Sequence, residues 1–205
     1  MGGAHLRIVA LGDSTTAGTP GFLSPLEAPP TGAGNPESQF AYWMMNLRPE
    51  WTVTNCGING ETSGDVLRRL PRDVLQHHPD YVVILAGVND VFRGIPPEST
   101  RANLTALYAG AHSVGIRVVA ASILPYNSMS RRQAEEMREL NRWIRQVAHE
   151  SGLAFCDTHT LVSDARVADR LAGSPDGFHP DVNGYRKMGE GLVRTIGAAE
   201  SGTDP

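Results

Sequence analysis

The sequence predicts an α/β protein, a three-layer α/β/α sandwich with a parallel sheet between two layers of helices. Short apolar runs alternate with helix-length segments along the 205 residues, and this alternation is typical of parallel strands joined by right-handed crossovers. The apolar runs are nearly continuous, which indicates strands that are covered on both faces. With 40% hydrophobic residues the chain can bury a sizeable core. No linker or repeat divides it, so we expect residues 1–205 to form a single domain.

Five segments carry the strand pattern. The first run ends at Gly12, the third ends at Gly87, and the fourth ends near Pro125, so turn-forming residues bound all three. The second run is short and β-branched, and the fifth is the weakest candidate. The predicted strands are Leu6–Leu11, Trp51–Asn55, Tyr81–Ala86, Ile116–Ile123 and Leu153–Cys156.

Five helices are expected between and after these strands. The second helix has apolar residues at helical spacing, although Pro71 predicts a break or a kink within it. The third opens with Pro and Glu, as helix starts commonly do. The fourth is the longest and most charged, with one apolar stripe. The predicted helices are Glu37–Leu47, Ser63–His77, Pro97–Ser113, Ser130–Glu150 and Asp181–Ile196.

Thr19–Ser38 is an irregular insertion that follows the first predicted strand. It contains five of the 14 prolines of the chain. In open parallel sheets, ligands bind beyond the carboxyl ends of the strands. We therefore expect this segment to form one wall of a site.

Composition and charge exclude several classes of protein. Eighteen Lys and Arg against 22 Asp and Glu give a net charge of −4, which argues against a nucleic-acid partner. Cys56 and Cys156 cannot form a disulfide framework, a single bridge between them being the less favoured alternative, and no spacing indicates zinc. No apolar run reaches the ~18–20 residues of a membrane span, so we expect no stable membrane insertion. The N-terminus lacks the features of a secretory signal, so we expect a soluble, cytoplasmic protein unless a signal peptide has been removed.

A serine lies directly after the first predicted strand, in Gly12-Asp13-Ser14-Thr15. A serine at a strand-to-helix turn can present its hydroxyl at the sheet edge, beside backbone N–H groups that face the group it attacks. The alternative is a helix N-cap, a position that serine also favours. The segment matches neither G-x-S-x-G nor a phosphate-binding loop.

Asp176-Gly177-Phe178-His179 lies near the other end of the chain. An aspartate and a histidine three residues apart on one turn can pair through the carboxylate and Nδ1–H, which leaves Nε2 free to serve a serine. The alternative is a surface loop with an incidental histidine. We adopt that simpler interpretation for His77 and His78, as an exposed helix end.

Two further segments could supply donors to an oxyanion. Gly87-Val88-Asn89-Asp90 follows the third predicted strand and offers a neutral amide, although the same residues are typical of a plain turn. The segment from Asn55 to Gly60 follows the second strand and offers glycine N–H groups; its alternative is a helix-entry loop. Segments that follow parallel strands meet at one sheet edge, and together these groups are what acyl transfer from an ester requires.

The four motifs resemble those of the SGNH (GDSL) hydrolases. Gly-Asp-Ser, a glycine in a second block, Gly-x-Asn-Asp and Asp-x-x-His occur in the family's order, and the resemblance spans residues 8 to about 195. It implies a flavodoxin-like fold with a five-stranded parallel sheet, which agrees with the five predicted strands. Thr15 departs from the leucine of the family's name and leaves the catalytic positions intact.

The resemblance also implies a role for each motif residue. Ser14 would be the nucleophile, His179 the base and Asp176 the partner of that base. The N–H groups of Ser14 and Gly60 and the side-chain amide of Asn89 would form the oxyanion hole. Gly57 is the alternative to Gly60. We expect a small-molecule ester as the substrate, and no cofactor or metal.

The leading hypothesis is a serine esterase that acts on short acyl esters such as acetates. A lysophospholipase or thioesterase of the same family is the alternative, which apolar residues within Thr19–Ser38 leave open. The third hypothesis is a flavodoxin-like module that binds phosphate or flavin at Gly12–Gly18. It leaves Asn89, Asp176 and His179 without a role.

Overall fold

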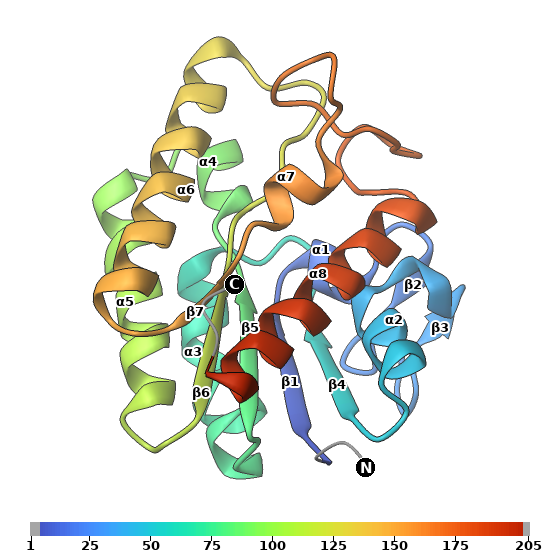
Figure 1. Cartoon of the computed structure of the whole chain (residues 1–205). Coiled ribbons are helices and arrows are strands. Elements are labelled where there is room, and N and C mark those ends of the chain that lie inside the picture. The colour runs from blue at the N-terminus through green and yellow to red at the C-terminus, as the bar shows by residue number, and fades with distance from the viewer. Residues whose placement is uncertain (1–4, 203–205) are drawn as a thin grey trace.

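The structure is a computed structural model that describes residues 5–202, and its centre is a five-stranded parallel sheet (Figure 1). The strand order is β4-β1-β5-β6-β7, which corresponds to the 2-1-3-4-5 order of flavodoxin-like folds. The predicted fold class is therefore confirmed. The strands are β1 (Arg7–Gly12), β4 (Thr52–Gly57), β5 (Tyr81–Leu85), β6 (Arg117–Ala121) and β7 (Ala154–Cys156).

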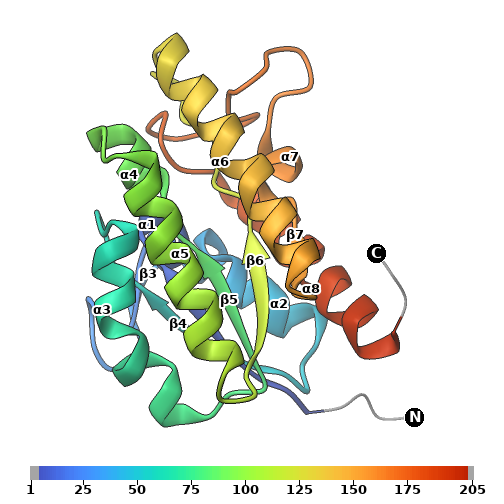
Figure 2. The same ribbon diagram turned by 90° about the vertical axis from the view of Figure 1, so that its left-hand side faces the viewer.

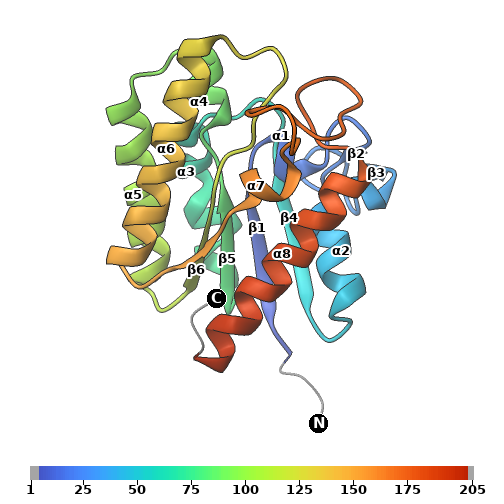
Figure 3. The same cartoon turned by 45° about the horizontal axis from the view of Figure 1, so that its top comes forward.

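Long helices cover both faces of this sheet (Figures 2 and 3). One layer consists of α3 (Ser63–Asp73), α5 (Pro97–His112) and α6 (Arg131–Glu150), and the other of α2 (Phe40–Leu47) and α8 (Val182–Ser201). Three short helices lie toward the carboxyl ends of the strands: α1 (Ser14–Ala17), α4 (Val88–Arg93) and α7 (Thr158–Val162). Within residues 5–202, no helix is both long and apolar enough to cross a membrane.

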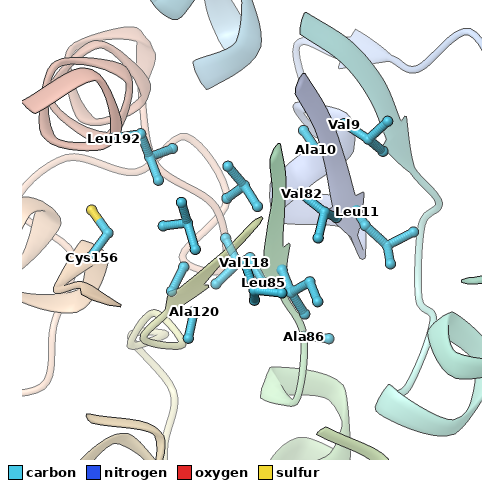
Figure 4. Packing of buried hydrophobic residues seen from close by; sticks show 14 of the residues in the cluster. Val9, Ala10, Leu11, Val82, Leu85, Ala86, Val118, Ala120, Cys156 and Leu192 are labelled. Atoms are coloured by element: carbon cyan, nitrogen blue, oxygen red, sulfur yellow. The ribbon is translucent and has the colours of Figure 1, made fainter. Parts of the chain in front are cut away.

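The core lies on both faces of the central strands (Figure 4). Every residue of β5 is buried, because this strand has a neighbour on each side and helices above and below. This burial explains the unbroken apolar run from which the strand was predicted. Cys56 on β4 and Cys156 on β7 are buried and unbridged, since these strands form opposite edges of the sheet.

Some predicted boundaries were wrong by a turn or less. The predicted helix Ser63–His77 ends at Asp73, because Val74 leaves the helical conformation with a φ of −126°, and the chain continues only as a 3₁₀ turn at Leu75–His77. Pro71 lies inside α3, where it removes one hydrogen bond within the helix. The helix predicted from Glu37 begins at Phe40, after a 3₁₀ turn at Pro36–Ser38.

The Thr19–Ser38 insertion folds against the end of β4. It contains a small antiparallel pair, β2 (Phe22–Leu23) and β3 (Ala33–Gly34). The Ser24 hydroxyl donates to the carbonyl oxygen of Gly57 at 2.6 Å, and the Glu27 carboxylate accepts the N–H of Asn59 at 2.9 Å. The insertion therefore holds the β4–α3 loop from outside.

The buried side chain of Arg69 joins the ends of two strands. Its guanidinium donates to the carbonyl oxygens of Gly12 and Cys56 at 2.7 and 2.8 Å. It also pairs with Glu61 at 2.5 Å and with Asp73 at 2.7 Å. The two carbonyl groups and the two carboxylates compensate a charge that is otherwise costly to bury.

We expect Arg69→Ala to lower the free energy of unfolding by about 3–5 kcal/mol, because removing one member of a buried ionic cluster leaves its partners uncompensated. Urea denaturation would measure the loss. Arg68→Ala is the matched control: the Arg68 side chain is 74% exposed, and an exposed pair contributes about 0–1 kcal/mol. Equal losses for the two variants would contradict this view of Arg69.

Candidate active site

A cavity of about 230 Å³ opens where the predicted motifs meet at the carboxyl edge of the sheet. Segments that follow β1, β4, β5 and β6 contribute to it, together with the segment before α8. None of the described lining residues comes from Thr19–Ser38. This segment contacts the lining from outside, through Asn59 and through the Thr19 N–H, which donates to the carbonyl oxygen of Ser14 at 3.1 Å. The lining residues are Ser14, Thr15, Asn59, Gly60, Val88, Asn89, Phe92, Tyr126, Phe178 and His179.

The structure brings Ser14, His179 and Asp176 into one chain of hydrogen-bond contacts. His179 Nε2 lies 2.8 Å from Ser14 Oγ, and His179 Nδ1 lies 2.6 Å from Asp176 Oδ2. Ser14 is the first residue of α1, is 9% exposed and lines the cavity. Asp176 and His179 come from the loop between α7 and α8.

The Asp176 carboxylate is held in its charged form. Partial burial alone would raise its pKa, but the contact with the His179 ring and the backbone N–H groups of Phe178 and His179 outweigh that effect. Both N–H groups donate to Asp176 Oδ1 at 2.8 Å. The net result is a lowered pKa for Asp176, as expected for a carboxylate that accepts several hydrogen bonds.

Two polar residues that the sequence analysis missed hold this loop in shape. The Ser174 hydroxyl accepts the N–H of Gly177 at 2.8 Å and donates to the carbonyl oxygen of His179 at 2.6 Å. Asn127, after β6, donates its backbone N–H to the carbonyl oxygen of Gly177 at 2.7 Å. Ser174 lies two residues before Asp176, so its place in the sequence could have indicated it. Asn127 is distant from Asp176 and His179 in the sequence and could not have been found in this way.

The two glycines considered for the oxyanion hole occupy different environments. Gly60 lines the cavity with a positive φ of 74°. Gly57 is buried against α1, where a Cβ atom would lie 2.0 Å from the backbone nitrogen of Ala17. Gly57 therefore serves the close approach of α1 to β4, while Gly60 faces the space in which a substrate would lie.

Asn89 lies in the first turn of α4 and lines the same cavity. Its Nδ2 donates one hydrogen bond, at 2.8 Å, to the carbonyl oxygen of Glu61. An amide nitrogen carries two hydrogens, so one remains to serve a ligand. The bond also links the loop after β5 to the loop after β4, next to Gly60.

The neighbouring Asp90 strengthens this link. Its buried carboxylate accepts the N–H and the hydroxyl of Ser63 at 2.8 and 2.6 Å, and the hydroxyl of Thr100 at 3.2 Å. Three helices, α3, α4 and α5, therefore meet at one carboxylate. In the structure Gly87-Val88-Asn89-Asp90 forms the start of α4 and not a plain turn.

Residues 10–187 match the sequence profile of the GDSL-like Lipase/Acylhydrolase family. The chain belongs to this family. The hydrolase is 27% identical over 177 residues to an arylesterase of Vibrio mimicus, a match that covers 86% of this chain and 81% of the relative. It is 27% identical over 172 residues to an acetylxylan esterase of Geobacillus stearothermophilus, which covers 78% of this chain and 76% of the relative.

Among solved structures, a G-D-S-L family protein of Desulfitobacterium hafniense matches the hydrolase with a TM-score of 0.78. The identity is 26%, and the match covers 93% of this chain and 99% of that chain. The predicted family is confirmed, and the protein is a serine ester hydrolase. The roles of Ser14, Asp176, His179, Gly60 and Asn89 stay predictions.

The hydrolase also has an unpaired buried carboxyl oxygen beside Ser14. Asp13 caps α1 by accepting the N–H of Thr15 on Oδ1, whereas Oδ2 is buried without a partner. Burial raises the pKa of Asp13 from its ordinary value of 3.8 to about 7; the Thr15 N–H opposes this shift, and the nearby Asp90 and Glu61 carboxylates add to it. Asp13 therefore titrates in the neutral range.

We expect Asp13→Asn to flatten the dependence of stability on pH. Between about pH 4 and 7 the folded protein keeps the proton on Asp13, while the unfolded chain has released it. The contribution of Asp13 to the free energy of unfolding therefore falls as the pH rises through this window. Asparagine keeps the cap without titrating. Urea denaturation at pH 4, 5.5 and 7 would measure the slope.

Asp164→Asn is the matched control, because Asp164 also accepts the N–H two residues ahead, that of Arg166 at 2.7 Å. This variant should keep the wild-type slope. An Asp13→Asn protein whose slope equals that of the wild type would contradict the assignment of a buried, protonated Asp13.

Proposed function

We propose that the hydrolase cleaves short-chain carboxylic esters with Ser14 as the nucleophile, His179 as the base and Asp176 as the group that orients the base. We also propose that residues 1–205 form one domain around this site. The observation that carries the proposal is the unbroken chain of contacts from Asp176 Oδ2 through the imidazole to Ser14 Oγ, at 2.6 and 2.8 Å.

In this mechanism Ser14 Oγ attacks the carbonyl carbon of the ester while His179 Nε2 takes the hydroxyl proton. Asp176 accepts Nδ1–H, which fixes the tautomer that leaves Nε2 free and stabilises the imidazolium once it forms. His179 then returns the proton to the leaving alcohol oxygen. A water molecule, activated in the same way, hydrolyses the acyl-enzyme and regenerates Ser14.

The negative charge that develops on the carbonyl oxygen requires donors on the opposite side from His179. We assign this role to the N–H groups of Ser14 and Gly60 and to the remaining hydrogen of Asn89 Nδ2. The positions of Gly60 and Asn89 on the cavity wall support the assignment. The contacts of Glu61 and Asp90 hold these donors before the substrate arrives, and such preorganisation is the usual source of oxyanion stabilisation.

The size of the cavity supports a short acyl group. Its volume of about 230 Å³ is below the ~300–1,000 Å³ typical of sites for drug-sized ligands. A lysophospholipase or a thioesterase of long chains would need a longer apolar groove. The activity named for the Geobacillus relative, an acetylxylan esterase, is on a short acyl group, acetyl. A flavin-binding module would show flavin absorbance in the purified protein.

We expect Ser14→Ala to lose ester hydrolysis by a factor of about 10⁴–10⁶, because only the hydroxyl attacks. The assay is the hydrolysis of p-nitrophenyl acetate, with circular dichroism to show that the variant folds. Ser113→Ala, at the exposed end of α5, is the matched control and should retain full activity.

More than a tenth of wild-type activity in Ser14→Ala would contradict the proposal. A higher kcat/KM for p-nitrophenyl octanoate than for p-nitrophenyl acetate would favour the long-chain alternative.

We expect Asn89→Ala to lower kcat by about 10²–10³ with little change in KM, because its free hydrogen acts on charge present only in the transition state. Steady-state kinetics with p-nitrophenyl acetate would measure both constants. Asn103→Ala is the matched control: its amide braces the same region by donating to Ser63 Oγ at 3.0 Å, outside the cavity lining. A raised KM with unchanged kcat in Asn89→Ala would make Asn89 a substrate contact instead.

A further inference from the structure

Three aromatic side chains from distant segments gather at the cavity, and we call them the aromatic platform. Phe92 comes from the end of α4, Tyr126 follows β6, and Phe178 stands between Asp176 and His179. Phe178 stacks on Tyr126 with ring centres 5.3 Å apart and an interplanar angle of 11°. Phe92 contacts both rings nearly at right angles, at 5.7 Å from Tyr126 and 5.6 Å from Phe178.

The platform leaves two large apolar rings open to solvent. Tyr126 is 2% exposed, whereas Phe92 is 49% and Phe178 is 41% exposed. Because Tyr126 covers one face of Phe178, the exposed part of that ring lies on the side away from Tyr126. Contiguous exposed apolar surface in a cavity is typical of a binding site, and the proposed triad gives these rings no role.

We propose that the aromatic platform binds an aromatic ring carried by the alcohol half of the ester substrate. This inference rests on the proposed function above, because it assumes that Ser14 and His179 act on an ester in this cavity. Aromatic rings attract one another in the stacked and perpendicular arrangements that the platform already uses. The described lining residues include no Asp, Glu, Lys or Arg, so a neutral ring suits the site.

The position of Phe178 indicates the alcohol half rather than the acyl half. In ester hydrolysis the base returns its proton to the leaving oxygen, so the alcohol departs from the His179 side. Phe178 directly precedes His179 and lines the same cavity. The proposed oxyanion donors, Gly60 and Asn89, instead hold the carbonyl oxygen of the acyl half.

Three unactivated esters test the inference through kcat/KM. Benzyl acetate carries the ring on the alcohol half, and its isomer methyl phenylacetate carries the same ring on the acyl half. Cyclohexylmethyl acetate replaces the aromatic ring by a saturated ring on an alcohol of similar reactivity. We expect the wild type to prefer benzyl acetate over each of the other two by about threefold to tenfold, the range that aromatic contacts supply.

Phe178→Leu and Phe92→Leu remove a ring while keeping an apolar side chain, and each should lower the ratio of benzyl to cyclohexylmethyl acetate by about the same factor. Phe155→Leu is the matched control, because Phe155 lies on β7 under Arg145 and outside this cavity; its ratio should equal that of the wild type. Thermal unfolding would show that all three variants fold.

The kcat/KM ratios separate the failure of the platform from the failure of the esterase proposal. A ratio that both platform variants leave unchanged would overturn the platform while leaving the esterase proposal intact. A preference for methyl phenylacetate that the variants abolish would overturn the assignment to the alcohol half. A wild-type protein that hydrolyses none of these esters, nor p-nitrophenyl acetate, would overturn the proposed function and this inference together.

Discussion

The guanidinium of Arg69 connects the sheet to the chemistry at its edge. It binds carbonyl oxygens at the ends of β1 and β4 and pairs with Glu61, whose own carbonyl oxygen accepts the Asn89 amide. A buried cation can be held only where every donor finds a partner, so this side chain constrains the strand ends and the loop that carries Gly60 at the same time. The spacing between the serine turn and the proposed oxyanion donors therefore depends on a residue outside the cavity.

Single polar side chains that each bind several groups also hold the other loops of the site together. The Asp90 carboxylate accepts hydrogen bonds from α3 and α5. The Ser174 hydroxyl forms hydrogen bonds within the loop that contains Asp176 and His179. Loops at a sheet edge have little apolar surface to bury, so their geometry must come from hydrogen bonds. Hydrogen-bond donors that are fixed before the reaction need little reorganisation free energy while charge develops in the transition state.

The fold and the motif residues were largely predictable from the sequence, and their surroundings were not. Tyr81–Ala86 is continuously apolar because β5 is covered on both faces, and this apolar run can be read from one short segment of the sequence. Asp176 and His179 are three residues apart, so their pairing is local as well. The aromatic platform depends instead on how α4, the loop after β6 and the loop between α7 and α8 pack together. No spacing within one segment encodes that packing, which is why Phe92 and Tyr126 were not identified as parts of the site.

The contact between Ser14 and His179 joins residues 165 positions apart, and this has a consequence for how the protein matures. The strands of the sheet, including β1 before Ser14, can pair before the segment that carries His179 has docked. Contacts of such long sequence separation form late in folding. During synthesis the serine leaves the ribosome long before its partner exists. With Ser14 and His179 as the proposed nucleophile and base, the appearance of esterase activity in a nascent or a refolding chain would therefore time the docking of the segment before α8 rather than the formation of the sheet.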